Sequence, residues 1–565
     1  MTFTASTYVN LVSERTAAQE RLVLQYMGPS NQFDIIVVGS GIGGGLLADD
    51  LADRVGQQKR ILVLEAGSFV YPTHVYNLCR FSNSAVAKHF ACDTFWQHGH
   101  PGSQYFIGEK PQLTFGGRSI FWSGLIPTIQ PWELEFFPPR VRADLQQGDP
   151  DLLAQAGEIM NASRTMGKPA AAIVEKLRAS PLDEHFVIEE TPRALHQPYL
   201  QPDGTPTDEF FTEPTGVFNT AELLVNQLGL TPGVKHGDGP GLHLLLNRYV
   251  EDVQNHGSHY ALVTRDTLNG QIRTFAAPTV VIAAGSIESP KLLHRSSMYP
   301  WFADSVKGMI GRGLTDHPTS HEIVTFVTDI ADVPIPKTTH AKIIFYSRGN
   351  RSSTGEIVYP FNVEMNINHE YWHLRENDPT APAAGFSTND PDGPSRIDIK
   401  FSFGNPLDEG NEVRPAPPFG YVPEIVFRNQ SWMDHLRHSR FPALANWQKD
   451  YGQIFAVMNS VTAEIFAQFQ IDGQPAEPEG DAAFGAGGKG FGFGTVHHAI
   501  GTLRMPFRPS LDAAMSFDSV VDEDLRVVGT DNLYVCDMSV MPFSSAANPV
   551  RTLAALALRL SRHLG

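Results

Sequence analysis

The 565-residue chain has few cysteines and no long apolar run. Its three cysteines, Cys79, Cys92 and Cys536, are too few for a disulfide framework, so we expect reduced thiols in a reducing compartment. No stretch approaches the roughly 20 consecutive apolar residues that cross a bilayer, and residues 1–30 lack the apolar segment of a signal peptide. The sequence therefore predicts a cytoplasmic protein with no membrane partner.

Positive charge is also scarce, with 43 basic against 61 acidic residues and a net charge of −18. Such a surface repels nucleic acid and anionic lipid but accommodates neutral or cationic small molecules. The apolar content of 42% and the charged content of 18% are those of an ordinary globular chain. Because the chain is long enough for more than one hydrophobic core, we expect two interleaved domains.

A dinucleotide-binding pattern stands near the N-terminus. The sequence FDIIVVGSGIGG covers residues 33–44, and its apolar run Ile35–Val38 predicts a buried parallel strand. Gly39 permits a tight turn, Gly41 lets the backbone approach a pyrophosphate, and Gly44 lets the following helix pack closely. The free N–H groups at the start of that helix favour a phosphate.

The next strand adds a ribose contact to this pattern. ILVLEAG, residues 61–67, carries Glu65, which would accept a hydrogen bond from a ribose 2′-hydroxyl and repel a 2′-phosphate. Strand, glycines, helix, second strand and acid follow one another with the spacing of a nucleotide site, which is more specific than the glycines alone. The alternative is that each glycine is a turn residue that contacts no ligand.

Three separated stretches have the pattern of a doubly wound core, and two long segments lie between them. HEIVTFVTDI and SRIDIKFSF, in the second long segment, alternate as antiparallel strands do. We predict an α/β protein with a Rossmann-like nucleotide-binding domain and an inserted substrate domain built on an antiparallel sheet. The nucleotide domain would comprise residues 30–130, 235–320 and 490–565, the substrate domain residues 131–234 and 321–489, and residues 1–29 a peripheral helix.

Some intervening stretches have narrower interpretations. Residues 242–254, 259–264 and 271–275 are expected to form successive strands leading into Thr279. Residues 375–396 are polar and turn-forming, which predicts a surface loop, with a lid over an active site as the alternative.

Five further motifs extend the pattern along the chain. They are GGRSIFWSG at 116–124, AAGSIESPKL at 283–292, GRGLTDHP at 311–318, HHAIGTLRM at 497–505 and NLYVCDMSVMPFSSAANP at 532–549. In this order and at these distances they resemble the glucose–methanol–choline (GMC) oxidoreductase family. Within it, GGRSIFWSG is similar to the signature of pyranose oxidases and glycoside-oxidising relatives.

The resemblance implies FAD as the cofactor. Its adenosine end would lie at the first glycine motif and Glu65, with the adenine beside a strand near residue 250. The pyrophosphate and flavin would lie along the stretch near residue 118, and the C-terminal motif would close over the ribityl chain. The implied cofactor-binding residues are Gly39, Gly41, Gly44, Glu65, Gly117, Arg118, Ser119, Val250, Ala284, Asp537, Asn548 and Pro549.

One position departs from the pyranose oxidase pattern. Those enzymes carry, immediately before the tryptophan that corresponds to Trp122, a histidine joined covalently to the flavin; here Phe121 stands in that place. A phenyl ring has no nucleophilic nitrogen, so we predict FAD held without a covalent bond.

The same resemblance assigns catalysis to His498 and Asn548. An imidazole can accept the alcohol proton near neutral pH without a metal, while hydride leaves the same carbon for flavin N5. A carboxamide can hydrogen-bond the substrate oxygen and stabilise charge that develops on it. The alternative for His498 is a structural histidine in a buried turn.

Other chemistry finds little support. His89, Cys92, His98 and His100 lie close together, but their spacing fits no standard zinc pattern, so we predict no metal site. Asp316, with its neighbour His317, is expected to be structural. No serine elbow with triad partners is present, which disfavours hydrolysis.

We therefore predict FAD-dependent oxidation of a secondary alcohol, a sugar or glycoside ring hydroxyl, to a ketone, with reoxidation by O2 or a quinone. Aromatic and polar residues in the second long segment favour a carbohydrate over an apolar substrate; they are Tyr359, Asn362, Glu364, Trp372 and Asp398. A sterol or aryl-alcohol oxidoreductase of the same fold is the first alternative. A non-catalytic flavoprotein is the second, and it would be expected to have lost His498 or Asn548.

Overall fold

The computed structural model describes most of both predicted domains. The described residues are 33–68, 96–97, 111–163, 168–196, 217–228, 241–368 (without 317, 338, 340, 354 and 356), 393–415, 423–426, 451–485 (without 481), 491–492, 498–508 and 514–565. The predicted N-terminal helix at 1–29, the His89–His100 cluster (apart from a short strand at 96–97) and residues 375–392 of the predicted loop lie outside them. At its end the loop prediction is wrong, because Ser395 and Arg396 begin a strand. In the described part, no helix is both long and apolar enough to cross a bilayer.

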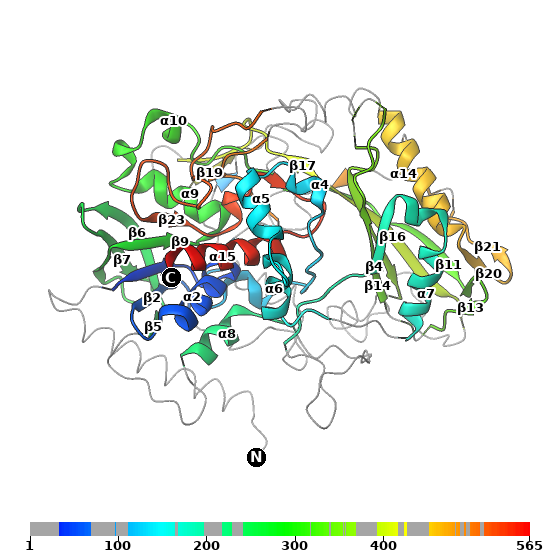
Figure 1. Ribbon diagram of the computed structural model, residues 1–565, viewed down its shortest axis with the longest axis horizontal. Coiled ribbons are helices and arrows are strands. Elements are labelled where there is room, and N and C mark those ends of the chain that lie inside the picture. The colour runs from blue at the N-terminus through cyan, green and yellow to red at the C-terminus, as the bar shows by residue number, and fades with distance from the viewer. Residues whose placement is uncertain are drawn as a thin grey trace, which may run out of the picture.

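A five-stranded parallel sheet forms the first lobe, on the left of Figure 1. Its strands come from three separate parts of the chain and stand in the order β23-β9-β1-β2-β5. Nearly every residue in them is buried, as expected of parallel strands covered on both faces. The strands are β1 (Ile35–Val38), β2 (Arg60–Leu64), β5 (Gly241–Leu245), β9 (Thr279–Ile282) and β23 (Leu533–Val535).

Helices α2 (Ile42–Val55) and α15 (Val550–Leu564) pack side by side on this sheet, although they stand at opposite ends of the sequence (Figure 1). Helix α9 (Gly285–Arg295) follows β9. The apolar faces of α2 and α15 enter the first of two hydrophobic cores. The predicted Rossmann-like fold is confirmed by this arrangement.

Residues 242–254, expected as part of one run of successive strands, divide between two sheets. Asn247, with φ of 59°, turns the chain between β5 and β6 (Arg248–Asn255). β6 then pairs with β7 (Tyr260–Asp266) and β8 (Ile272–Ala277) in a separate antiparallel sheet. Strand β9 follows directly and returns to the parallel sheet.

A seven-stranded antiparallel sheet forms the second lobe (Figure 1). One face carries Val363, Met365 and Phe401 into the second hydrophobic core, beneath helices α7 (Lys168–Arg178) and α14 (Tyr451–Phe466). HEIVTFVTDI and SRIDIKFSF, predicted to be antiparallel strands, contain β11 and β16, and the structure shows that these two strands pair with one another. The strands are β4 (Phe186–Glu190), β10 (Thr319–Ser320), β11 (Ile323–Val327), β14 (Ala341–Ser347), β15 (Phe361–Ile367), β16 (Ser395–Phe403) and β22 (Phe491–Gly492).

The remaining elements are short. Small sheets join β17 (Asn405–Pro406) with β24 (Phe543–Ser544), β18 (Glu412–Pro415) with β19 (Pro423–Val426) and β3 (Trp96–Gln97), and β12 (Asp329–Ile330) with β13 (Val333–Pro334), β20 (Phe469–Ile471) and β21 (Gln474–Pro475). The other helices are α4 (Pro131–Leu134), α5 (Pro139–Gln146), α6 (Leu152–Ile159), α8 (Thr220–Gln227) and α10 (Asp304–Lys307), with single 3₁₀ turns at Gly117–Ile120, Pro181–Glu184, Tyr299–Trp301 and Met538–Val540.

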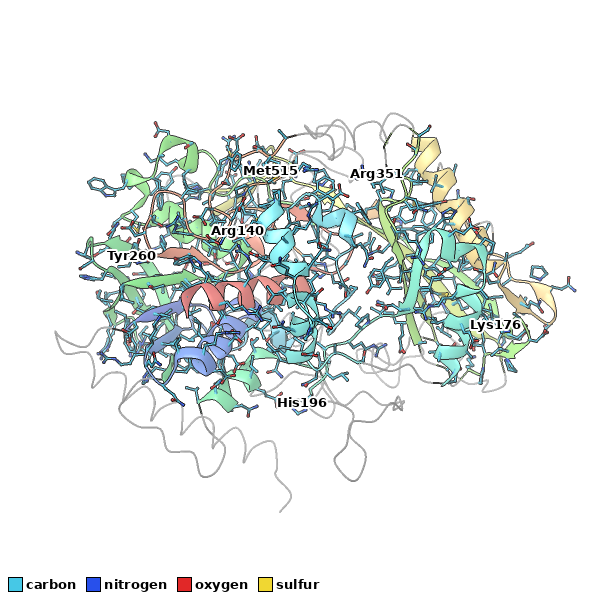
Figure 2. The ribbon with its side chains drawn as sticks, viewed as in Figure 1. Arg140, Lys176, His196, Tyr260, Arg351 and Met515 are labelled. Carbon is cyan, nitrogen blue, oxygen red and sulfur yellow. The ribbon has the colours of Figure 1, made fainter. Side chains whose placement is uncertain are left out.

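The packing at residue 131 differs from the expected domain boundary. Helices α4, α5 and α6 place Trp132, Leu145 and Leu153 in the first core, although the sequence analysis assigned them to the substrate domain. An ion pair joins them to the second lobe: Arg351, labelled in Figure 2, lies 3.0 Å from Glu135 at the end of α4. Residues 131–160 therefore pack with the nucleotide-binding sheet while touching the second lobe.

Candidate active site

The turn between β1 and α2 brings the backbone against open space. Gly39 has φ of 104°, and a Cβ there would lie 2.4 Å from the Ala283 carbonyl oxygen. A Cβ at Gly44 would lie 2.1 Å from the Gly39 carbonyl oxygen, so helix and strand pack too closely for a side chain. At Gly41, by contrast, φ is −64° and no atom of the described residues lies within 4 Å of a Cβ. Packing against the described part of the chain therefore does not require a glycine at this position.

Glu65 ends β2 beside this turn, and its side chain is only 5% exposed. Its Oε2 accepts hydrogen bonds from the Ser40 amide and hydroxyl at 3.0 and 2.5 Å, and its Oε1 accepts one from the Gly67 amide at 2.8 Å. Burial raises the pKa of Glu65 above its ordinary value, while these hydrogen bonds lower it. The carboxyl group is thus held in one orientation at the end of the strand.

A large cavity opens at the carboxyl ends of β1, β2 and β9, where parallel α/β sheets bind ligands. It contains about 1250 Å³ of space between atoms, with open solvent at its mouth included. Nine of the twelve predicted cofactor residues line it: Gly39, Gly41, Glu65, Gly117, Arg118, Ser119, Val250, Ala284 and Asp537. The other three do not: Gly44 packs α2 against β1, and Asn548 and Pro549 precede α15, whose Leu553 does line the cavity.

The predicted catalytic residues stand on two separate segments, and neither His498 nor Asn548 itself lines this cavity. His498 is half-buried, its backbone N–H donates to Asp316 Oδ1 at 3.2 Å, and the next residue, Ala499, lines the cavity. Asn548 is also half-buried and follows the short strand β24. Asp316 is fully buried, consistent with the structural role expected for it, while His317 and His497 lie outside the described residues.

Comparisons with known proteins agree with this geometry. Residues 444–557 match the family model for GMC oxidoreductase. The chain is similar to pyridoxine 4-oxidase of Microbacterium luteolum, with 24% identity over 92% of this chain and 96% of that protein. A crystal structure of pyridoxine 4-oxidase from Mesorbium loti superposes with a TM-score of 0.53 at 17% identity, covering 94% of this chain and 99% of that one, and supports the fold.

The C-terminal part of this chain, residues 444–557, is a GMC oxidoreductase domain. The chain is accordingly an FAD-dependent alcohol oxidoreductase, and FAD is the predicted cofactor. The cavity fits that group, because open space at Gly41 and the first N–H groups of α2 lie where a diphosphate would be bound.

Asp537, one of the predicted cofactor residues, accepts several hydrogen bonds within the protein. Asp537 Oδ2 accepts from the Gly285 amide at 2.9 Å and the Ser289 hydroxyl at 2.5 Å, and Oδ1 accepts from the Ser539 amide at 2.9 Å. Asp537 therefore fastens the start of α9 to the turn after β23, in addition to lining the cavity.

A second network fixes the Gly117–Ile120 turn. The Thr220 hydroxyl donates to the Ser40 carbonyl at 2.7 Å, and the Thr220 amide donates to Ser119 Oγ at 3.0 Å. The Gly116 amide donates to Ser40 Oγ at 2.9 Å, so the turn is joined to the first glycine motif. Phe121, next in sequence, is buried in the first core.

Several cavity-lining residues were not among the predicted set. Tyr249 donates its hydroxyl proton to Glu288 Oε2 at 2.9 Å, and Lys291 lies 2.5 Å from the same oxygen. Glu288 and Lys291 belong to the AAGSIESPKL motif, in which only Ala284, at the strand-to-helix turn, carries a predicted cofactor contact. The additional lining residues include Ser40, Gln112, Tyr249, Ser286, Glu288 and Met538.

Proposed function

We propose that this GMC oxidoreductase oxidises a secondary alcohol, a ring hydroxyl of a sugar or glycoside, to a ketone. The supporting observation is a face of the seven-stranded sheet that carries buried polar groups and leads to the Asn548 segment. An enzyme for a polyhydroxylated ring needs several such groups, whereas a sterol site would be mainly apolar.

The polar face lies opposite the second core. Across β15 and β16, Asn362 stands beside Ser402, and Asn366 stands beside Asp398. All four are at most 7% exposed. The Nδ2 atom of Asn362 and the Oδ1 atom of Asn366 are buried and make no hydrogen bond within the described part of the chain. These atoms could bind substrate hydroxyl groups.

The charged members of this face form a compact cluster. Lys342 Nζ lies 2.8 Å from Glu364 Oε2, and Lys400 Nζ lies 3.3 Å from the same oxygen. Burial lowers the pKa of Lys342, which the neighbouring Glu364 opposes. Just beyond β16, β17 pairs with β24, which leads directly to Asn548.

In the proposed mechanism, His498 accepts the proton of the substrate hydroxyl and the Asn548 carboxamide donates a hydrogen bond to the same oxygen. FAD, when bound, supplies the hydride acceptor at N5. The cofactor-binding roles predicted for the twelve residues, and a non-covalent attachment, belong to this proposal. We further propose O2 or a quinone as the electron acceptor and, from the scarcity of cysteine, a cytoplasmic location.

A second candidate substrate class is a hydroxymethyl group on an aromatic ring. The relatives named as pyridoxine 4-oxidase support it, because one of them aligns with nearly the whole chain. The buried carboxyl and amino groups of the polar face could equally bind the charged ring of pyridoxine.

Anaerobic bleaching of the flavin separates the two substrate classes. Purified enzyme would be mixed with D-glucose, methyl β-D-glucoside, pyridoxine, benzyl alcohol or cholesterol, and the flavin absorbance followed by stopped flow. Bleaching by a sugar or glycoside is expected. Bleaching by pyridoxine alone would move the assignment to the aromatic alcohol, and bleaching by none of the five would overturn the proposal. Reoxidation would then be timed with O2 and with benzoquinone.

The catalytic roles are tested by truncating each side chain. His498→Ala should retain its flavin and reduce it 10²–10⁴-fold more slowly, as is typical for loss of a general base. Asn548→Ala should slow reduction by about 10²-fold, as is found when an oxyanion donor is removed. His256→Ala and Asn255→Ala, in an exposed turn, are the matched controls. Reduction of either test variant at the wild-type rate would remove that residue from the mechanism.

A further inference from the structure

Two fully buried acids outside the cavity contact the backbone of the two catalytic segments. Glu133 and Asp316 each have 0% exposure, and neither lines the cavity. A buried carboxyl group is costly unless it is hydrogen-bonded, so the partners of these two groups indicate why they are there.

Glu133 spans two segments that are more than 400 residues apart. Its Oε2 accepts a hydrogen bond from the Gln130 amide at 2.9 Å, which begins α4. Its Oε1 accepts one from the Ala546 amide at 2.5 Å. Ala546 is two residues before Asn548, so the carboxyl group fixes the backbone that carries this carboxamide.

Apolar and polar contacts hold the same segment around that hydrogen bond. The ring of Phe136, just after α4, stacks on Phe543 with centroids 4.1 Å apart and planes 5° from parallel. The Ser545 hydroxyl donates to the Ala547 carbonyl at 2.6 Å. Because residues 543–547 are all buried, the Ala546 amide could not bond to water if Glu133 withdrew.

Asp316 has the corresponding place beside His498. Its Oδ1 accepts from the His498 amide, and the preceding Thr315 exchanges backbone hydrogen bonds with Ile500 at 3.2 and 2.9 Å. The side chain of Asn405 donates to Thr315 Oγ1 at 2.8 Å and to the Asp316 carbonyl at 3.0 Å.

Asn405 also connects the two segments. It belongs to β17, where it pairs with Ser544 of β24, four residues before Asn548. The contacts therefore run without a break from the His498 segment through Asp316 and Asn405 to the segment of Asn548 and Glu133.

We infer that Glu133 and Asp316 are positioning residues that fix Asn548 and His498 relative to one another. The inference rests on the proposed function. Both oxygens of the Glu133 carboxyl group accept from backbone N–H groups, whereas a carboxamide has one oxygen and could accept from only one of them. The Oδ1 atom of Asp316, which accepts from the His498 amide, has a counterpart in the side chain of asparagine.

A double-mutant cycle tests this coupling, with flavin reduction by methyl β-D-glucoside, or by pyridoxine if the panel selects it. Glu133→Gln should lower the limiting reduction rate at least tenfold, with little change in the substrate concentration that gives half that rate. In Asn548→Ala enzyme, Glu133→Gln should lower the limiting reduction rate less than twofold, because the carboxamide that Glu133 positions is absent. An equal loss in both backgrounds would show a merely structural role and overturn the inference.

The role of Asp316 is tested by comparing its removal with a conservative substitution. Asp316→Ala should slow reduction at least tenfold, and Asp316→Asn should restore it to within about threefold of wild type. In His498→Ala enzyme, Asp316→Ala should slow flavin reduction less than twofold. Glu135→Gln, half-buried at the end of α4 where it pairs with Arg351, is the matched control and should behave as wild type.

Hydrogen exchange gives a readout independent of turnover. Peptides covering 543–548 should lose amide protection in Glu133→Gln but not in Glu135→Gln, and those covering 498–501 should lose it in Asp316→Ala. Unchanged protection would overturn the inference while leaving the proposed function intact. Reduction at the wild-type rate in Asn548→Ala or His498→Ala would overturn both.

Discussion

At the scale of single residues, the glycines of the β1–α2 turn serve different physical needs. Gly44 is required by packing, because the Gly39 carbonyl occupies the position of its Cβ. Gly41 faces open cavity with an ordinary backbone conformation, so any constraint on it comes from a ligand.

Alanine substitutions separate these two needs. Gly41→Ala should cost about 1 kcal/mol or less in folding, since the backbone accepts a Cβ there, yet weaken FAD binding at least tenfold by blocking approach of the diphosphate. Gly44→Ala should cost about 3 kcal/mol by forcing α2 away from β1. Thermal midpoints of the flavin-free proteins and flavin titrations measure both. Equal loss of stability in the two variants would contradict the assignment.

Phe121 carries a prediction about the cofactor bond. Because a buried phenyl ring offers no nucleophile to the flavin, acid precipitation should release all the FAD into the supernatant and leave a colourless pellet. Phe121→Tyr and wild type should release it equally. A yellow pellet from wild type, or fluorescence in a tryptic peptide, would show a covalent link elsewhere in the chain.

Most of the cofactor cradle was predictable because its residues act locally. Gly39, Gly41 and Glu65 take their roles from positions within one strand–turn–helix–strand unit, which the sequence displays directly. Tyr249 and Glu288 were not predicted, because their contact forms only when the fold brings β6 and α9 together. Glu133 was missed for the same reason: its partner Ala546 is in another part of the chain.

At the scale of elements, a buried charged residue holds α15 in place, and the helical periodicity of the sequence does not reveal it. Arg559 is 7% exposed and contacts three groups: Asp144 at 2.7 Å, Asp524 at 3.1 Å and the Glu523 carbonyl at 2.6 Å. It therefore joins α15 to α5 and to the loop before β23.

Replacing this guanidinium should destabilise the first lobe. Arg559→Met keeps the apolar stem but removes the guanidinium that pairs with Asp144 and Asp524. The free energy of unfolding should fall by about 2 kcal/mol and no more, because both acids are partly exposed and can be hydrated. Arg562→Met, three residues on and exposed, is the control. The midpoint of urea unfolding measures the difference, and matching midpoints for the two variants would refute the anchor role.

Elements whose pattern matched their surroundings were predicted, and those at junctions were not. The buried apolar run of β1 and the alternation of β11 and β16 each indicated the correct strand type. The predicted domain boundary at residue 131 does not coincide with the packing, because the apolar side chains of α4 to α6 enter the first core. Amphipathic periodicity shows that a helix has a buried face but not which of two cores receives it.

At the scale of the whole molecule, buried carboxyl groups make stability depend on pH. Burial raises the pKa of Glu133, Glu190 and Asp49 to about 7, from ordinary values near 4. Between these values the folded state binds more protons than the unfolded state, so these groups make stability fall as pH rises. Burial of His294, whose pKa is lowered to about 4, acts in the opposite direction up to its ordinary value of 6.5.

Comparing wild type with Glu133→Gln isolates one of these contributions, because the other groups are common to both proteins. Relative to the variant, the wild-type free energy of unfolding should be greatest below about pH 4.5 and decrease until pH passes about 7. A shift from 4.5 to about 7 corresponds to about 3 kcal/mol in total. Thermal midpoints of both proteins from pH 4 to 9 measure the difference, and Glu135→Gln should run parallel to wild type. A difference that stays constant or grows with pH would mean that Glu133 is ionised throughout, held as a carboxylate by the amides of Gln130 and Ala546.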